Sequence, residues 1–426
     1  MNEVEGIRLE EFRQLKKEIR GSREYLIVGI DVAKEKHHAF FGTATGKTLL
    51  KRLIFDNTIE GFRKLGVQVE AIQVAQSLSK VVFGLEPTAN YHKPLGEYLI
   101  KCGRMVVLVS GVAVKRNREL LDGRWDKHDT KDAANIADLI SQGKCLFYEY
   151  PEMWLRDLRG LLSLKRKLKK QEHSYRVRIR NQLLAQYFPE LDRYSGRPEV
   201  EAIVRWCLDP SRIAGLENDQ FRRLVAPGRK TLAQHHRLHT IQKLAVDSIG
   251  CEMGEGACLE AQVMVDGLRH IREAIKATEA KIEEICGSFP EYACLLTIPG
   301  FGPDVSSKVL GALGNPHRFQ NQKQVLKTAG LDLSADRSGK GSQTAVPIIS
   351  KQGKADLRYA LYQAALVAST QNIDFMRYYT QQLQSREKEP GIKTKRWVKL
   401  SAKLLIIAWT IMKKQEPFDS RYFNQE

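Results

Sequence analysis

Four acidic residues stand at positions where a parallel-sheet fold would gather them. Asp31 ends the apolar run YLIVGID, Glu86 follows the run VVFGL, and Asp129 and Asp132 lie together in KHDTKDAANIADLI. Clustered carboxylates repel one another in an apolar setting, so a bound cation is expected to neutralise them. Carboxylate oxygens suit Mg²⁺, or Mn²⁺ in its place, better than zinc; two such ions about 4 Å apart would activate a nucleophile and stabilise a leaving oxygen. The four acids therefore predict metal-assisted chemistry on a phosphodiester.

Side-chain spacing predicts which way these acids point. On an extended strand, Asp31 falls on the same face as Ile27 and Gly29. Asp129 and Asp132 are three residues apart, so on a helix they share one face, which an apolar stripe continues. Unpaired carboxylates on the core side of a helix are costly. The spacing therefore favours a functional role for this pair.

Each acid also has a plain structural explanation. Asp31 and Glu86 would serve equally well as polar strand ends. Asp129 would serve as a helix cap and Asp132 as a favourable first-turn acid. It is the order of all four along the chain that favours a shared site.

A candidate nucleophile lies downstream in the loop DRSGKGSQT. Ser338 is flanked there by Arg337 and Lys340, which would hold a phosphate or favour an alkoxide. An isolated Ser-Gly pair is more often part of a flexible loop, and Ser334 and Ser342 are competing candidates. No Ser-His-Asp pattern supports hydrolase chemistry around this loop.

The charge balance predicts the partner. The chain has 426 residues, a net charge of +18 and a sequence pI of about 9.5, which favours a polyanion such as nucleic acid. Ribosomal and membrane-surface proteins are also basic. A dense basic stretch occupies 165–180, and four of its residues are the candidate nucleic-acid contacts: Lys165, Arg166, Lys169 and Arg176. A solvated helix face is the alternative interpretation.

A second candidate contact is the run IPGFGP at 298–303, between two helical patterns. Gly300 and Gly302 would let the backbone turn tightly, and the following helix N-terminus would offer free N–H groups to a phosphate. The pattern resembles a helix-hairpin-helix; an ordinary turn between two helices is the alternative.

Three regions position these residues. Strands are expected at 25–31, 37–41, 48–55, 81–86 and 105–109, with helices at 6–20, 61–79, 94–101, 112–121 and 129–142. A three-strand meander followed by strand–helix alternation predicts an α/β domain of ribonuclease-H type over 1–150. Residues 151–289 read as a helical coiled-coil hairpin or small bundle. Residues 290–426 read as a mainly α domain with the hairpin motif and two long helices, 354–384 and 394–414.

The remaining signals concern compartment. The seven cysteines form no CxxC pair, so they are expected to be reduced and mostly in the core, as in a cytosolic protein. The N-terminus is charged rather than a signal peptide, and the apolar run 400–412 is too short to span a bilayer.

These motifs together resemble the DEDD transposases of bacterial insertion sequences, which act as bridge-RNA-guided recombinases. GIDVAK, GLEPTANYH and KHDTKDAANIADL resemble the family's RuvC-like domain. IPGFGP, AGLDLSADRSGKG, SKQGKADLRYALYQAA and WVKLSAKLLIIAW resemble its C-terminal transposase domain. The middle matches only as helical. The chain departs from the family at Leu333, where proline is common.

The resemblance implies a mechanism. Asp31, Glu86, Asp129 and Asp132 would hold Mg²⁺, and Ser338 would attack the scissile phosphate to form a phosphoserine link to DNA. A structured guide RNA would select both target and donor DNA. Strand exchange would occur in a homo-oligomer, a dimer or tetramer, in the bacterial cytoplasm and at the nucleoid when active.

Two other functions fit the residues. A resolvase-like nuclease would use the four acids and water without a serine intermediate. A non-catalytic RNA- or DNA-binding scaffold would need no metal.

Overall fold

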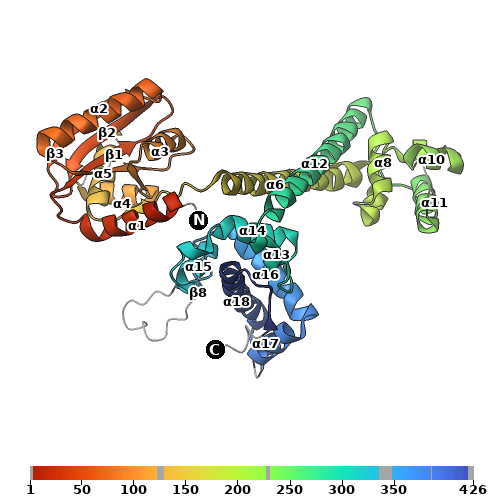
Figure 1. Cartoon of the computed structure of the whole chain (residues 1–426). Coiled ribbons are helices and arrows are strands. Elements are labelled where there is room, and N and C mark those ends of the chain that lie inside the picture. The colour runs from red at the N-terminus through yellow and green to blue at the C-terminus, as the bar shows by residue number, and fades with distance from the viewer. Residues whose placement is uncertain (1–2, 122–128, 227–230, 335–347, 385, 421–426) are drawn as a thin grey trace. The chain divides into compact units, whose positions relative to one another are not determined.

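The computed structural model describes residues 3–121, 129–226, 231–334, 348–384 and 386–420. The chain forms two compact units, Met1–Glu152 and Met153–Glu426 (Figure 1). The first unit is a mixed α/β domain, and the second is almost entirely helical over its described residues. Within the described ranges, no helix combines the length and apolarity needed to cross a membrane.

The first unit alternates strands and helices. Its elements are α1 (Glu3–Glu18), β1 (Tyr25–Asp31), β2 (Lys36–Thr43), β3 (Thr48–Asp56), α2 (Ile59–Gln76), β4 (Lys80–Leu85), α3 (His92–Lys101), β5 (Met105–Leu108), α4 (Gly111–Leu121), α5 (Asp129–Ser141) and β6 (Leu146–Phe147). Strand β6 was not expected, because a two-residue strand is too short to show a period.

The strands form one six-stranded sheet in the order β3-β2-β1-β4-β5-β6. The first three strands pair antiparallel, as a meander with short connections allows. β4 pairs in parallel with β1, and β5 pairs in parallel with β4, each after a helical crossover. β6 pairs antiparallel with β5 at the far edge. The parallel centre therefore carries three strand ends at one edge of the sheet.

Both faces of this sheet are covered, as the alternation of side chains along β1 shows. Leu26 and Val28 are buried in one core with residues of α2 and α3. Tyr25 and Ile27 are buried in the opposite core with residues of α1 and α5. Asp31 continues the second set, so it lies on the α5 face, as its spacing predicts.

The second unit consists of short helices around two long ones. Its elements are α6 (Met153–Arg178), a π-helical turn (Ile179–Leu184), α7 (Ala185–Tyr187), a 3₁₀ turn (Pro189–Tyr194), α8 (Pro198–Trp206), α9 (Pro210–Ala214), α10 (Asn218–Val225), α11 (Leu232–Val246), α12 (Glu255–Gly287), α13 (Pro290–Leu296), α14 (Pro303–Leu313), a 3₁₀ turn (Pro316–Arg318), α15 (Gln322–Ala329), β7 (Leu333–Ser334), β8 (Ile348–Ile349), α16 (Ala355–Gln371), α17 (Ile373–Leu383) and α18 (Ile392–Lys414).

The long helices α6 and α12 run antiparallel to each other. Three ion pairs set the direction, because residue numbers rise along α6 as they fall along α12: Lys165–Glu279, Glu172–Arg272 and Arg178–Glu260. A separate apolar core lies beyond the pair and involves residues 179–268. The pair therefore joins this distal core to the C-terminal core.

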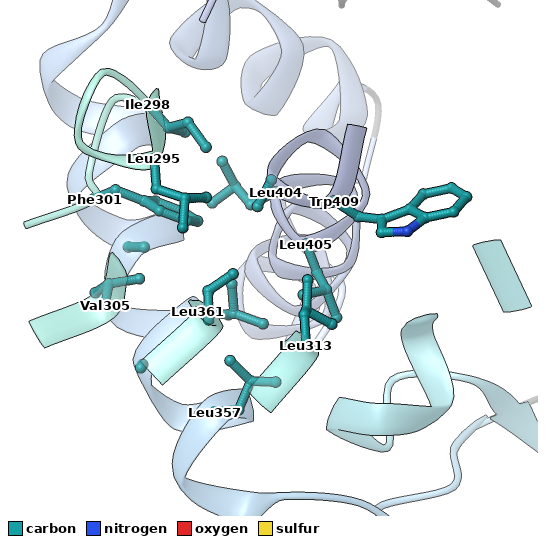
Figure 2. Close-up of a cluster of buried hydrophobic side chains, with 14 of the residues drawn as sticks. Leu295, Ile298, Phe301, Val305, Leu313, Leu357, Leu361, Leu404, Leu405 and Trp409 are labelled. Atoms are coloured by element: carbon teal, nitrogen blue, oxygen red, sulfur yellow. The ribbon is translucent and has the colours of Figure 1, made fainter. Parts of the chain in front are cut away.

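The C-terminal core gathers α13, α14, α16 and α18 around one apolar cluster. Figure 2 shows side chains of this cluster from the four helices and from the turn between α13 and α14: Leu295, Ile298, Phe301, Val305, Leu313, Leu357, Leu361, Leu404 and Leu405. Trp409 extends from α18 away from these side chains. The indole Nε1 of Trp409 donates to the carbonyl of Pro316 at 2.8 Å, which satisfies the polar atom of this aromatic side chain.

Two expectations about this unit and the cysteines are wrong. The helix expected over 354–384 is two helices, because Asn372 is extended (φ −118°) and its side chain caps α17 by accepting from the amides of Asp374 and Phe375. Only three of the seven free cysteines are buried: Cys145, Cys207 and Cys286. Cys102 and Cys251 are exposed, and Cys258 and Cys294 are partly exposed, with Cys294 at the edge of the C-terminal core.

Candidate active site and nucleic-acid interface

The first pair of predicted acids lies at the carboxyl ends of two neighbouring parallel strands. Ile30 of β1 pairs with Leu85 of β4, so Asp31 and Glu86 come next on their strands. In open α/β sheets this edge is where ligands bind. The sequence order alone placed the two acids on separate strands; the parallel pairing makes them neighbours.

Helix α5 lies directly on these strands because two glycines leave room for it. A Cβ at Gly29 would collide with the backbone carbonyl of Ala133 and crowd the amide of Ala137. A Cβ at Gly84, which pairs with Gly29 across the strands, would collide with Ile140. The two glycines therefore form the seat on which α5 rests.

The direction of α5 brings its first turn toward Asp31. The far end of the helix reaches the start of β1, where Arg20 Nε donates to the carbonyl of Gln142 at 2.9 Å. The opposite end, which begins with Asp129 and contains Asp132, therefore lies toward the carboxyl end of β1. Asp132 is 3% exposed; the side chain of Asp129 lies outside the described atoms.

Glu86 lies against the start of α4. A Cβ added to Gly111, the first residue of that helix, would come within 2.7 Å of Glu86 Oε1. A side chain at position 111 would occupy the space of the Glu86 carboxylate, so glycine is needed there. Gly111 gave no signal in the sequence, because its role depends on a residue 25 positions earlier.

Asp132 lies beside a cation that the sequence did not indicate. Arg118 of α4 places its Nη2 atom 2.5 Å from Asp132 Oδ1. The contact is an ion pair without hydrogen-bond geometry, because Asp132 Oδ1 accepts no hydrogen bond of acceptable geometry from the described atoms. His38 was missed as well: it pairs with Asp31 across β1 and β2 and therefore shares its face.

The donor chemistry of the acids fits a hard cation. Asp31, Glu86 and Asp132 offer only carboxylate oxygens, and Asp132 Oδ1 is buried without a hydrogen bond. Among the residues with described side chains, no three His, Cys, Asp or Glu are close enough together to hold an ion. The side chain of Asp129, the fourth predicted ligand, lies outside the described atoms.

The predicted nucleophile falls outside the described residues. Ser338, Arg337 and Lys340 all lie in the segment 335–347, as does the competing Ser342. The ends of that segment are anchored: β7 and β8 pair antiparallel, and Ser350 Oγ donates to Asp332 Oδ1 at 2.6 Å. The competing Ser334 belongs to β7, with its side chain outside the described atoms.

The hairpin glycines have different surroundings. Gly300 has a positive φ of +85°, and a Cβ there would collide with the carbonyl of Ala364 in α16. Gly302 is exposed with open space around it and stands at the N-cap of α14. The turn at Gly300 is thus also a packing requirement, whereas Gly302 faces solvent.

The N-terminus of α14 already holds an anion of its own. Asp304 in its first turn contacts Lys308 at 2.6 Å and Lys165 at 2.8 Å. Burial alone would raise the pKa of Asp304, but the hydrogen bonds and charges of the two lysines outweigh it and lower that pKa. A phosphate at this helix end would have to compete with the carboxylate.

Lys165 is an internal link between three helices. Its Nζ lies 2.9 Å from Glu279 of α12 as well as near Asp304 of α14. Burial would lower the pKa of Lys165, and the hydrogen bonds to both carboxylates outweigh that effect and raise it. Lys165 therefore holds α6 to its neighbours in addition to any external contact.

A groove of about 1150 Å³ lies between α6, α12, α14 and the start of α16. Cations outnumber anions among its lining residues: the basic side chains are Arg159, Lys165, Arg166, Lys169, Lys170, His173, Lys308 and Lys354, and the carboxylates are Glu279, Asp304 and Asp356. Three of the four predicted contacts on α6 thus line one groove.

Part of this positive charge is paired within the protein. Arg166 lies 3.0 Å from Asp356 in a half-exposed pair, and Lys169, itself half-exposed, lies 3.3 Å from Glu172, which is 16% exposed. Such pairs are weak in water and exchange readily for another anion. Arg176 is exposed on α6 beyond the groove lining.

Lys308 and Lys354 were missed by sequence reasoning. They lie at least 128 residues after the basic stretch 165–180, and only the folded unit brings them to the same groove. Lys170 and His173 belong to the basic helix itself, and their spacing from Arg166 would have indicated them.

Two family models match this chain. A DEDD transposase model of the IS110 group, described as "Transposase", covers residues 28–189, and a model described as "Transposase IS116/IS110/IS902 family" covers residues 292–380. The first spans the sheet, α5 and α6, and the second spans α13 to α17. The distal helices between them are matched by neither.

Several known proteins are similar in sequence to this chain. A pilin gene-inverting protein of Moraxella bovis is 30% identical over 162 residues, 37% of this chain and 48% of that protein, so the chain spans about half the length of this relative. An insertion element IS110 protein of Streptomyces coelicolor is 24% identical over 84% of this chain and 87% of its own length. A putative transposase for IS117 from the same organism is 22% identical over 73% of this chain. The chain is therefore similar to IS110-type transposases in two separate segments, 28–189 and 292–380.

Proposed function

We propose that this chain is a DNA recombinase that moves or inverts a DNA element by cutting and rejoining strands through a phosphoserine intermediate. The two transposase domains and the relatives named for transposition and gene inversion support this function. The strand order, with an antiparallel meander followed by parallel strands, supports a ribonuclease-H-like interpretation of the first unit.

One observation carries the proposal. Gly29 and Gly84 seat α5 on the two parallel strands whose ends carry Asp31 and Glu86. This arrangement gives the acid-bearing end of α5 a fixed place beside those strand ends. A helix cap or a strand end would need no such seat.

In the proposed reaction, Ser338 Oγ attacks the scissile phosphorus and loses its proton. The new bond joins phosphorus to Oγ, and the bond from phosphorus to one deoxyribose oxygen breaks; that oxygen leaves as a hydroxyl after taking up a proton. Rejoining is the reverse attack by a deoxyribose hydroxyl, which restores the serine. No phosphodiester energy is lost in the cycle, because one ester replaces another.

The protein's residues would hold and orient the phosphate. Mg²⁺, or Mn²⁺ in its place, bound by Asp31, Glu86, Asp129 and Asp132 would supply charge stabilisation at the phosphate oxygens. Arg337 and Lys340 would contribute further positive charge beside the nucleophile.

The basic groove is the proposed nucleic-acid contact of the second unit. Lys169, Lys170 and Lys308 would face phosphates of DNA or of a structured guide RNA that pairs with target and donor. Arg176 would extend this contact along α6, and Gly302 would allow a backbone approach at the hairpin. A homo-oligomer, dimer or tetramer, would bring serine and acids of different protomers together, in the bacterial cytoplasm and at the nucleoid.

Trapping the adduct tests the function. The full-length protein is incubated with its copurifying RNA, a nicked DNA substrate carrying the element end, and Mg²⁺, and protein-linked DNA is resolved after denaturation. We expect an adduct with wild type and none with Ser338→Ala, which should still bind RNA and DNA. Peptide mapping should place the phosphate on Ser338.

Other results would select a different reaction. Cleavage without an adduct would indicate water as the nucleophile, as in a junction nuclease. A phosphate on Ser334, Ser342 or a tyrosine would overturn the assignment of Ser338. Mixing Ser338→Ala with Asp31→Ala should restore activity if protomers share the site.

A further inference from the structure

Helix α4 touches two of the four candidate acids. Its first residue, Gly111, lies against the Glu86 carboxylate. Two turns further on, Arg118 reaches Asp132. A helix N-terminus carries partial positive charge and Arg118 a full one, so α4 presents positive charge to both acids.

The contact with Asp132 is largely removed from water. The side chain of Asp132 is 4% exposed and that of Arg118 is 21% exposed. A buried carboxylate without a counter-charge is strongly destabilising. In the protein without a metal, the charge of Asp132 therefore depends on Arg118.

The helix that carries Arg118 is tied to α5 by contacts other than the one with Asp132. Asn117 Nδ2 donates to Asn135 Oδ1 at 2.5 Å and to Asp138 Oδ2 at 2.8 Å. Asn135 Nδ2 in turn donates to the carbonyl of Val114 at 2.6 Å. These bonds hold α4 to α5 without the Arg118–Asp132 contact, so the backbone at Arg118 should keep its place when the carboxylate takes another partner.

The geometry of the Arg118–Asp132 contact also allows another cation to replace Arg118. Arg118 meets Oδ1, and that oxygen accepts no hydrogen bond of acceptable geometry from the described atoms. A ligand oxygen held by an aligned, bidentate arginine would be strongly retained. Here the same oxygen is held by charge alone, and a cation of higher charge density competes well for it.

We propose that Arg118 is the internal counter-cation of Asp132 and that it limits the metal affinity of the site. A metal ion that enters the site must displace Arg118 from the Asp132 carboxylate. The inference rests on the proposed role of the acids as metal ligands. Because the two cations compete for one carboxylate, removing Arg118 must strengthen metal binding, whereas a purely supporting residue would weaken it on removal.

Manganese titration of the full chain tests the inference. Free Mn²⁺ is measured by electron paramagnetic resonance for wild type, Arg118→Gln, Arg118→Lys and Arg116→Gln, without nucleic acid. Arg116 is the matched control, because it lies exposed on the same helix and its removal changes net charge equally. We expect Arg118→Gln to bind Mn²⁺ roughly five- to tenfold more tightly, a typical coupling between competing partners. Arg118→Lys should lie between wild type and Arg118→Gln, and Arg116→Gln should match wild type.

Equal or weaker Mn²⁺ binding by Arg118→Gln than by wild type would overturn the proposal. So would equal gains in Arg118→Gln and Arg116→Gln, since net charge would then be the cause. If Arg118→Gln unfolds, Arg118→Lys carries the test: it must bind Mn²⁺ more tightly than wild type.

Strand cleavage by wild type is measured in parallel to separate this inference from the proposed function. If wild type cleaves DNA but the Arg118 variants bind Mn²⁺ with the affinity of wild type, only the proposed role of Arg118 is wrong. Tighter Mn²⁺ binding by Arg118→Gln with no cleavage or adduct by wild type removes only the recombinase function.

Discussion

The acid site of the first unit and the basic groove of the second handle charge in opposite ways. At the acid site, a rigid framework of glycines and buried asparagines places few charges, and one of them, Asp132, is buried beside a single guanidinium. In the groove, many cations lie on exposed helix faces and share their charge with nearby carboxylates. A site for chemistry needs fixed geometry, whereas a surface for a polyanion needs only net charge within reach.

Substitution in the glycine seat should give the largest of the predicted effects. Gly29→Ala places a Cβ on the carbonyl of Ala133, which is backbone and cannot rotate away, so α5 must shift. We expect a loss of about 3 kcal/mol or more in the free energy of unfolding, measured by chemical denaturation.

Gly66→Ala is the matched control for this substitution. It lies in α2 with open space around it, so it should be neutral or stabilising by up to about 1 kcal/mol. Equal stabilities for the two variants would show that α5 does not rest on Gly29.

Removing an acid should affect chemistry more than stability. Asp31→Ala should reduce strand cleavage by more than about a hundredfold, because a group that stabilises developing charge at a reaction centre is typically worth that much. The circular dichroism spectrum and the melting curve should stay close to those of wild type.

Glu60→Ala is a matched acid removal outside the site, in the first turn of α2. Its cleavage rate should equal that of wild type. Normal cleavage by Asp31→Ala in Mg²⁺ would instead remove Asp31 from the site.

Groove substitutions should produce a graded effect on binding. The double variant Lys169→Gln and Lys170→Gln should bind DNA more weakly. The slope of log affinity against log salt should flatten by about 1 to 2, because fewer phosphate contacts form on binding and fewer counterions are released. Cleavage of saturating substrate should change little.

The control for net charge is the pair Lys51→Gln and Arg52→Gln on exposed positions of β3. Its salt slope should equal that of wild type. Identical salt slopes for both double variants would mean that Lys169 and Lys170 belong to a solvated helix face and do not contact nucleic acid.

The smallest predicted effect is a pH dependence of stability at the junction of α6, α12 and α14. The pKa of Asp304 is lowered in the folded chain from an ordinary value of 3.8, because the lysine contacts outweigh its burial. Its contribution to stability is thus present above that value and is lost as pH falls through the lower folded pKa.

Melting curves at pH 7 and pH 3 check this dependence. Asp304→Asn should melt below wild type at pH 7, and the difference should shrink at pH 3. A difference that stays constant with pH would assign the effect to packing rather than to charge.

Much of the first unit could be predicted from residue patterns alone. Tyr25–Asp31 is the strand that the alternation of apolar residues indicates, and the face of Asp31 follows from the two-residue period. The helix that begins at Asp129 was likewise evident from its spacing. These features are local, because each depends on backbone geometry over a few residues.

What only the tertiary structure decided are the partners of those residues. The contact of Arg118 with Asp132, the position of Glu86 against Gly111, and the link of Lys165 to Glu279 and Asp304 all join residues that are distant in sequence. Any exposed lysine or arginine has the same local pattern whether it meets a carboxylate of the same chain or a phosphate. The pairing depends on how strands and helices pack, which charge and period along the chain do not specify.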